Sequence, residues 1–169
     1  NCEIAAIYHK PLTEEDKGKE RGLSANSIHL DYLRHIKGID ENLGRLLDTL
    51  DELKIAEDTV IVYSSDNGYY LGERGLGDKR ALYEEGLRIP YIVRYPRLFP
   101  KGKLVDDMVI NQDLAPTFLD LAGLPAHPGM HGRSFKDLAL GKKPSDWRTS
   151  FLAYYKKELG DTPNCHGIR

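Results

Sequence analysis

The sequence has little of several features that mark special classes of protein. It contains two cysteines, two methionines and one tryptophan among 169 residues, and no apolar run approaches the roughly 20 residues that a membrane-spanning helix requires. Its 24 basic and 26 acidic residues nearly cancel, leaving a formal net charge of -2. No basic stripe interleaved with aromatic residues indicates a nucleic-acid surface. We therefore expect a soluble globular chain with no nucleic-acid partner and no membrane span.

Neither end of the sequence resembles a natural boundary. It begins at Asn1 and shows no basic segment followed by an apolar one, so neither a natural start nor a signal peptide is visible. It stops at Gly167-Ile168-Arg169, which looks like the beginning of a strand. We therefore expect part of a longer chain. Cys2 and Cys165 allow a disulfide, but two thiols near the ends of such a part leave the redox compartment open.

The apolar pattern predicts helices and strands in succession. Apolar residues recur every three or four positions from about Ser24 to Leu50, which is typical of a long amphipathic helix, with Ser24 or Asn26 as its cap. The continuous apolar run at 59–64 predicts a strand buried on both faces of a parallel sheet. Further strands are expected at 91–95, 108–110 and 151–155, and helices at 113–121, capped by Asp113, and at 135–140.

These elements predict an α/β fold in two parts. Residues 124–132 are dense in Pro, Gly and His and are the best candidate for a boundary. Residues 1–123 would then belong to a large α/β domain with a mostly parallel sheet. Residues 124–169 would open a small C-terminal α+β subdomain.

Asp66 and Asn67 are candidate ligands for a metal ion. They come directly after the strand at 59–64, and ligands of open α/β sheets bind outside the carboxyl ends of strands. A carboxylate beside a carboxamide suits Ca²⁺ or Mg²⁺ better than Zn²⁺, which prefers nitrogen and sulfur. Taken alone, Asp-Asn-Gly is also a common turn tripeptide, so a simple turn is the alternative.

Lys79 is a candidate for binding an anion beside that cation. The preceding glycines, Gly72, Gly75 and Gly77, let the backbone pass close to a bound anion. The lysine would supply a mobile positive charge. The alternative is that Lys79 and Arg80 form a solvated surface pair. His127 and His131 are weaker candidates for metal ligands, because they lack a convincing third partner, and the alternative is that they are loop residues. His9 is a weak candidate for an active-site histidine.

A series of short motifs from about Tyr32 onward resembles the sulfatases of the alkaline phosphatase superfamily. The series consists of Tyr32-Leu33, the segment 40–47, Ser65-Asp66-Asn67-Gly68, Leu71-Gly72-Glu73-Arg74-Gly75, Asp78-Lys79-Arg80, Tyr83-Glu84-Glu85, Arg88-Ile89-Pro90, the segment 113–117 and Gly132-Arg133-Ser134-Phe135. The resemblance implies the C-terminal part of an alkaline-phosphatase-like sandwich. It also implies hydrolysis of a sulfate ester at a Ca²⁺ site.

The resemblance also implies roles for individual residues. Residues matching Asp66 and Asn67 bind the cation in that family, and the one matching Lys79 contacts the sulfate as a catalytic residue. His166, shortly before a Gly-hydrophobic-Arg strand, matches a histidine near the substrate. The nucleophile motif, a Cys or Ser followed by Pro and Arg, is absent. A formylglycine nucleophile and further ligands are thus expected in a missing N-terminal half, and we expect no useful turnover from the present residues alone.

The substrate class and two alternatives follow from the same motifs. Asp78-Lys79-Arg80 and Tyr83-Glu84-Glu85 resemble those of sulfatases acting on sulfated carbohydrates such as glycosaminoglycans, including N-acetylglucosamine-6-sulfatase-like members. The family implies a periplasmic, secreted or lysosomal location. A phosphodiesterase or phosphonate hydrolase of the superfamily is one alternative, although two-metal enzymes typically have a histidine where Asn67 stands. A non-catalytic binding module is the other.

Overall fold

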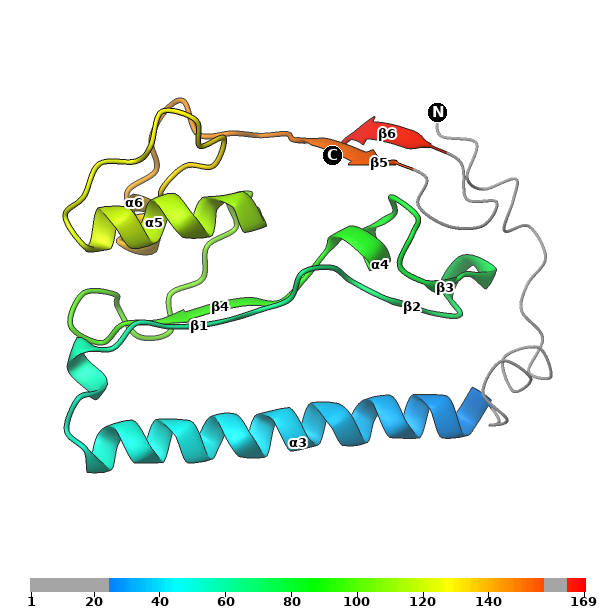
Figure 1. The fold of residues 1–169 in the computed structure, drawn as a ribbon, viewed down its shortest axis with the longest axis horizontal. Helices are drawn as coiled ribbons and strands as arrows, with labels where there is room; N and C mark the ends of the chain where they lie inside the picture. Colours follow the sequence, from blue (N-terminus) through cyan, green and yellow to red (C-terminus); the bar gives the residue numbers. More distant parts are fainter. Residues whose placement is uncertain (1–24, 157–163) are drawn as a thin grey trace.

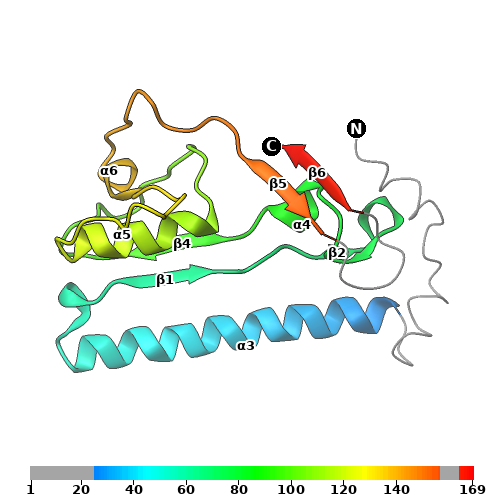
Figure 2. The ribbon, with the colours of Figure 1, turned by 45° about the horizontal axis from the view of Figure 1, so that its top comes forward.

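The computed structural model describes residues 25–156 and 164–169, and its elements lie in layers (Figures 1 and 2). Strands β1 (Ile61–Ser64) and β4 (Tyr91–Arg94) form the middle layer. The long helix α3 (Ala25–Glu52) runs along one side of this pair. Helices α5 (Leu114–Leu121) and α6 (Lys136–Ala139) lie on the other side. This mixture of helices and strands agrees with the α/β class expected from the sequence.

Helix α3 confirms the long amphipathic helix. It is continuous through Gly38 and Gly44, where an added Cβ would meet no atom within 4 Å, so neither glycine marks close packing with a described residue. Most of its large apolar side chains are exposed, among them Leu33 at 59% and Ile39 at 47%. The candidate cap Ser24 and the side chain of Asn26 lie outside the described part. None of the helices that the structure describes is long and apolar enough to cross a membrane.

The β1–β4 pair is antiparallel, which differs from the parallel neighbour predicted for the strand at 59–64. Ser64 lies opposite Tyr91 and Ile61 opposite Arg94. The chain therefore leaves β1 and enters β4 at the same end of the pair, as in a hairpin. A parallel neighbour would need a connection that crosses to the opposite end. The segment 65–90 makes this excursion and carries the candidate site.

The expected strand at 108–110 does not form, because side chains make hydrogen bonds to the backbone groups that a neighbouring strand would use. The carbonyl of Met108 accepts a hydrogen bond from Trp147 Nε1 at 3.0 Å, and the amide of Ile110 donates to Asp113 Oδ2 at 2.9 Å. The helix predicted at 113–121 is confirmed as α5, and that at 135–140 as α6.

Two further antiparallel pairs complete the sheets. Strand β2 (Tyr70–Leu71) pairs with β3 (Gly77–Asp78), and β5 (Leu152–Tyr155) pairs with β6 (Cys165–Ile168). The predicted strand at 151–155 is thereby confirmed, whereas residues 167–168, expected to begin a strand, lie at the end of β6. Cys165 is buried, and its candidate disulfide partner Cys2 lies outside the described residues. The short helical elements are η1 (Ala56–Asp58), η2 (Glu73–Gly75), α4 (Glu84–Leu87) and η3 (Asn111–Asp113).

Two clusters of buried residues join elements that are far apart in the sequence. One consists of Tyr70, Leu76, Ala81 and Cys165 and joins the β2–β3 hairpin to β6. The other consists of Phe135, Leu138 and Trp147 and packs against β4, where the Tyr91 and Phe135 rings meet edge to face at 5.6 Å. Residues on both sides of the segment 124–132 therefore share a core, and the domain boundary expected there stays a prediction.

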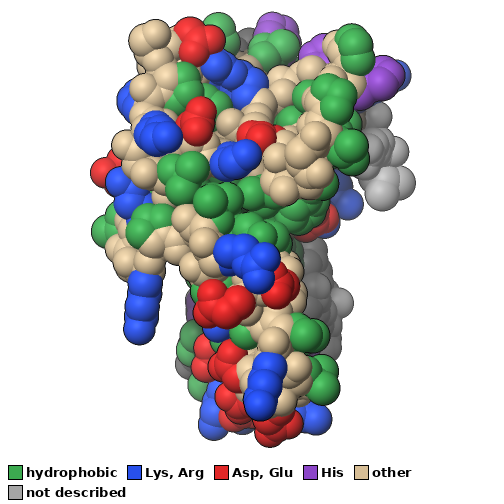
Figure 3. All heavy atoms as spheres, turned by 90° about the vertical axis from the view of Figure 1, so that its left-hand side faces the viewer, with side chains coloured by type: hydrophobic (Ala, Val, Ile, Leu, Met, Phe, Trp, Pro, Cys, Tyr) green, Lys and Arg blue, Asp and Glu red, His purple; other side chains and the backbone are tan. Residues whose placement is uncertain are grey.

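Charged side chains of both signs mix on the surface near the end of α3. Seen from that end, Asp, Glu, Lys and Arg side chains gather at the bottom of the molecule, with hydrophobic side chains above them (Figure 3). Arg94 pairs with Asp51 of α3 at 3.7 Å, and Arg97 pairs with Asp58 of η1. These ion pairs join the far end of β4 to the helix layer.

Candidate active site

The loop after β1 presents Asp66 and Asn67. Ser65 Oγ donates a hydrogen bond to the Asn67 carbonyl at 2.8 Å, and Asn67 Nδ2 donates to the Gly68 carbonyl at 2.7 Å. These bonds commit the serine hydroxyl and the amide nitrogen to the loop backbone. Asn67 Oδ1 receives no hydrogen bond from any residue between 29 and 156, and the Asp66 carboxylate is exposed. Ser65 Oγ also lies 3.5 Å from Asp66 Oδ1, so Asn67 Oδ1 and Asp66 Oδ2 are the oxygens left available to a ligand.

Gly68 holds this loop against helix α4. Its amide donates to the Gly86 carbonyl at 2.9 Å, and an added Cβ would lie 2.0 Å from the Glu85 carbonyl oxygen. Only glycine allows so close an approach of the two backbones. The Asp-Asn-Gly tripeptide thus needs its glycine for packing as well as for turning.

The β2–β3 hairpin brings Lys79 to the end where this loop enters. Tyr70 lies opposite Asp78, so the chain enters the hairpin just after Tyr69 and leaves it at Lys79, both at the same end. Asn67 is two residues before Tyr69. Lys79 is exposed, and Asp78 before it has a left-handed φ of 66° and forms an ion pair with Arg80. An exposed ammonium group and the loop of Asp66 and Asn67 therefore share one end of the hairpin.

Tyr70 supports the segment after Lys79, a role that sequence reasoning missed. Its side chain is 1% exposed, and its hydroxyl donates to the Ala81 carbonyl at 3.0 Å and accepts from the Tyr83 amide at 3.1 Å. Burial raises the pKa of Tyr70, so the hydroxyl keeps its proton for this role. Adjacent Tyr69 is 40% exposed, and nothing in the local pattern distinguishes the two tyrosines.

His166 lies on β6, beside this hairpin. Cys165 packs into the cluster of Tyr70, Leu76 and Ala81, and successive strand residues point to opposite faces. His166 is accordingly exposed, opposite Tyr154 of β5. The strand that carries His166 therefore packs on the Lys79 hairpin, while the imidazole occupies the face away from that packing.

Asp66 and Asn67 supply the kind of oxygen ligands that a hard cation prefers, but too few of them to complete its coordination. Carboxylate and amide oxygens are the donors that Ca²⁺ prefers, and Ca²⁺ takes about six to eight of them. Within residues 25–156 and 164–169, no group of three or more His, Cys, Asp or Glu side chains could hold a metal ion. His127 Nδ1 accepts a hydrogen bond from the Gly129 amide at 3.0 Å, as part of a local turn. His9 lies outside the described residues.

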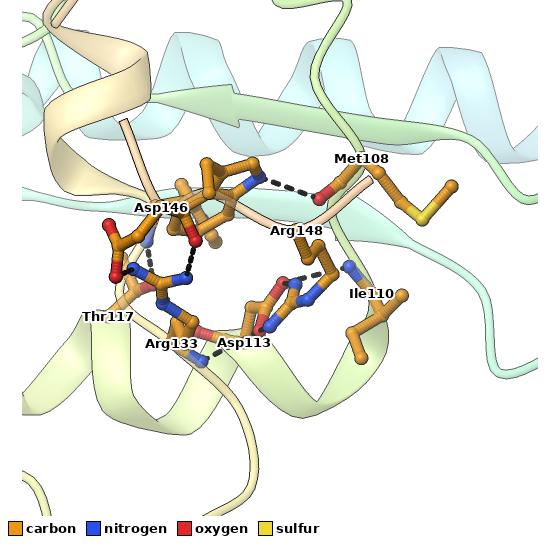
Figure 4. A network of polar contacts seen from close by, with 9 residues as sticks. Met108, Ile110, Asp113, Thr117, Arg133, Asp146 and Arg148 are labelled. Carbon is orange, nitrogen blue, oxygen red and sulfur yellow. Dashed lines mark hydrogen bonds and ion pairs between the residues drawn. The ribbon is translucent and has the colours of Figure 1, made fainter. Parts of the chain in front are cut away.

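Asp113 holds together segments that are far apart in the sequence (Figure 4). The sequence predicted that it caps α5, but its side chain makes no capping bond there. Its carboxylate, 0% exposed, accepts hydrogen bonds from the amide of Arg133 at 2.8 Å and from both terminal nitrogens of Arg148, in addition to the Ile110 amide. The capping prediction was wrong, because a paired guanidinium satisfies a buried carboxylate better than a lone backbone amide does.

Comparisons with known proteins identify relatives of this chain. An N-acetylglucosamine-6-O-sulfatase from Bacteroides thetaiotaomicron is 45% identical over 173 residues, which cover 97% of this chain and 31% of that protein. A solved structure in complex with its substrate D-glucosamine-2-N,6-O-disulfate is 40% identical, with a TM-score of 0.77 over 82% of this chain and 29% of that one. A phosphonate monoester hydrolase from Silicibacter pomeroyi is 32% identical, with a TM-score of 0.68 over 75% of this chain and 25% of that one.

The chain thus spans about a third or less of the length of these relatives. Residues 72–169 match the family described as N-sulphoglucosamine sulphohydrolase, C-terminal. That match covers more than half of the chain and includes Lys79 and His166. The chain belongs to this family of sulfatases, within the alkaline phosphatase superfamily.

Proposed function

We propose that these residues form the C-terminal part of a Ca²⁺-dependent sulfatase that hydrolyses a sulfate ester on a sulfated carbohydrate. The observation that carries the proposal is the shared position of Lys79 and the Asp66-Asn67 loop at one end of the β2–β3 hairpin. A cationic group beside two hard oxygen ligands suits an anionic ester. Relatives named as sulfatases support the reaction class.

In this proposal each side chain has a distinct task. Asp66 and Asn67 donate oxygens to Ca²⁺, which, when bound, offsets the repulsion between an anionic nucleophile and an anionic ester. Lys79 donates to the sulfate oxygens, where its charge stabilises the transition state more than the ground state. His166, exposed on the face of β6 that points away from the Lys79 hairpin, would contact only a part of the substrate that extends past the hairpin to that outer face. Tyr70 keeps the backbone around Lys79 in place through its two hydrogen bonds.

The formylglycine nucleophile and the remaining cation ligands would come from an N-terminal half of the same domain. An apolar groove of about 680 Å³ between α3 and β1 supports this proposal, since Ile39, Leu43, Leu46 and Tyr63 line it. Exposed apolar surfaces of this kind usually receive a partner. The 31% coverage of the Bacteroides relative leaves ample chain to fill the groove. Without that half, the present residues would have no useful turnover.

A sulfated sugar is the substrate class that the relatives favour. The solved structure at 40% identity contains D-glucosamine-2-N,6-O-disulfate as its substrate, and the 45% identical relative is named for N-acetylglucosamine 6-O-sulfate hydrolysis. We extend that class to this protein as a proposal. Cleavage of phosphonate monoesters is the second candidate, because the Silicibacter pomeroyi hydrolase is also similar over 75% of the chain.

Calorimetric titration of the full-length protein with Ca²⁺, together with hydrolysis assays, tests the proposal. Asp66→Ala should abolish Ca²⁺ binding and sulfate ester hydrolysis. Lys79→Ala should retain Ca²⁺ binding but lower kcat/KM by about 10²- to 10³-fold, the usual effect of removing a donor to a developing oxyanion. Asp106→Ala and Lys101→Ala, at exposed positions in the loop after β4, are matched controls that should change neither measurement.

The same assays separate the alternatives. Glucosamine 6-sulfate and a 4-nitrophenyl phosphonate monoester are offered to the parent protein side by side. Faster turnover of the phosphonate ester would replace the sulfatase proposal with the second candidate. A full-length protein that binds no Ca²⁺ and cleaves neither ester would instead be a non-catalytic binding module.

A further inference from the structure

Asn111 reaches across the fold to the loop that carries Asp66 and Asn67. Its Nδ2 donates to the backbone carbonyl oxygens of Ser65 and Asp66, at 3.2 Å each. These residues are 46 and 45 positions away in the sequence. One side-chain amide therefore joins η3 to the point where β1 ends and the candidate ligands begin.

The turn that carries Asn111 is itself held in place. Asp113, two residues further on, accepts the Ile110 amide and so closes the turn, while its other contacts run to Arg133 and Arg148. Because the Asp113 side chain is fully buried and held by several donors, the turn has little freedom to move. Asn111 therefore extends from a rigid support to an exposed loop.

We propose that Asn111 is a positioning residue for the cation site. It would hold the Ser65 and Asp66 carbonyls so that the side chains of Asp66 and Asn67 keep the orientation a hard divalent cation needs, without touching the cation itself. The inference rests on the proposed function, because it takes those two side chains as ligands. Ordering an exposed loop when a ligand binds costs conformational entropy, and a loop ordered beforehand avoids that cost.

The chemistry of a carboxamide suits this task. Its two N–H groups can serve two carbonyl oxygens at once. Unlike a lysine or arginine, it adds no positive charge that would repel a cation beside the loop. Support from a neutral donor thus preserves the negative potential that Asp66 provides.

Calcium titration of the full-length protein with two substitutions at position 111 tests the inference. Asn111→Ala removes the donor without adding charge, and Asn111→Asp removes it at constant shape while adding a negative charge. Gln112→Ala and Gln112→Glu make the same changes at the adjacent exposed residue. A neutral hydrogen bond changes an equilibrium by roughly two- to twelvefold, so we expect both Asn111 variants to bind Ca²⁺ about tenfold more weakly. Both Gln112 variants should stay within threefold of the parent.

Activity measured against Ca²⁺ concentration supplies the second readout. If Asn111 acts by positioning the loop, Asn111→Ala should need about tenfold more Ca²⁺ for half-maximal sulfate ester hydrolysis and should recover the parental kcat at saturation. Affinity within threefold of the parent in Asn111→Ala would overturn the inference. Stronger Ca²⁺ binding in Asn111→Asp would also overturn it, because the charge near the loop alone would then set the affinity. So would a kcat of Asn111→Ala that stays below the parental value at saturating Ca²⁺.

The same titrations distinguish a failure of the proposed function from a failure of this inference. If Asp66→Ala leaves Ca²⁺ affinity unchanged, the cation site itself is wrong and the inference falls with it. If Asp66→Ala abolishes binding and Asn111→Ala has no effect, the cation site stands and only the role of Asn111 is refuted.

Discussion

Replacing Asp113 by Asn should destabilise the protein strongly, although the change preserves shape and removes a single charge. The native carboxylate is 0% exposed and pairs with Arg148, whose side chain is 12% exposed. It also accepts the backbone amides of Ile110 and Arg133. In Asp113→Asn, the new amide nitrogen would confront donors of Arg148, and the guanidinium would stay buried without its counter-charge.

The expected loss follows from burial rather than from the number of contacts. Removing one partner of a buried ion pair costs about 3–5 kcal/mol, because the remaining charge has lost its hydration and gained nothing in return. Arg133 with Asp146 offers the matched comparison, since the pairing atoms are 2.9 Å apart and the Asp146 side chain is 76% exposed. An exposed pair contributes about 0–1 kcal/mol. We therefore expect Asp146→Asn to cost less than about 1 kcal/mol.

Urea unfolding of the full-length protein measures both losses. A shift of the midpoint at unchanged m-value reports the change in the free energy of unfolding. The double variant Asp113→Asn/Arg148→Met should lose less than the sum of the single changes, because it also removes the stranded charge. A shift for Asp113→Asn no larger than that for Asp146→Asn would refute the reasoning.

Two further predictions concern the loop after β1 and the α5 surface. Gly68→Ala should cost about 1–3 kcal/mol of stability and weaken Ca²⁺ binding, because its Cβ would overlap the Glu85 carbonyl. In thermal unfolding, Gly167→Ala, where a Cβ meets no atom within 4 Å, should shift the midpoint little; equal shifts would contradict the packing argument. Hydrogen bonds from Lys136 and then Ser134 hold the pKa of Asp120 below its ordinary value. Its contribution to stability is therefore present above the unfolded-state pKa and is lost as pH falls through the lower folded-state pKa. Asp120→Asn should flatten the loss of thermal stability as the pH falls below about 4, by less than about 1 kcal/mol because the group is partly exposed; a profile that still parallels the parent would exclude this role for Asp120.

Much of the fold could be predicted from local sequence. The regular spacing of apolar residues marked α3, and short apolar runs marked β1, β4 and β5, because these patterns depend only on neighbours along the chain. The pairing direction of β1 and β4 could not be predicted the same way. A continuous apolar run is typical of strands in parallel sheets, but it does not fix the direction of any one neighbouring strand.

Some residues of the candidate site could likewise be predicted from local motifs, and others could not. Asp66, Asn67 and Lys79 stood out because they occur in short motifs with a recognisable order. Asn111 carried no such signal, since its partners at 65 and 66 are specified only when η3 comes to lie beside the end of β1. Asp113 was noticed but given a local role, because a capping residue before a helix is the simplest reading of an aspartate there.

The sequence by itself determined the family, the candidate ligand pair and lysine, and most of the longer helices and strands, because motifs and periodicity are local properties. Only the tertiary structure decided that Tyr70 rather than Tyr69 is buried, that Arg148 neutralises Asp113, and that Asn111 holds the candidate cation loop. Each of these depends on segments that meet only in space. Burial and charge pairing arise from contacts between distant segments, so the pattern of residues along the chain does not reveal them.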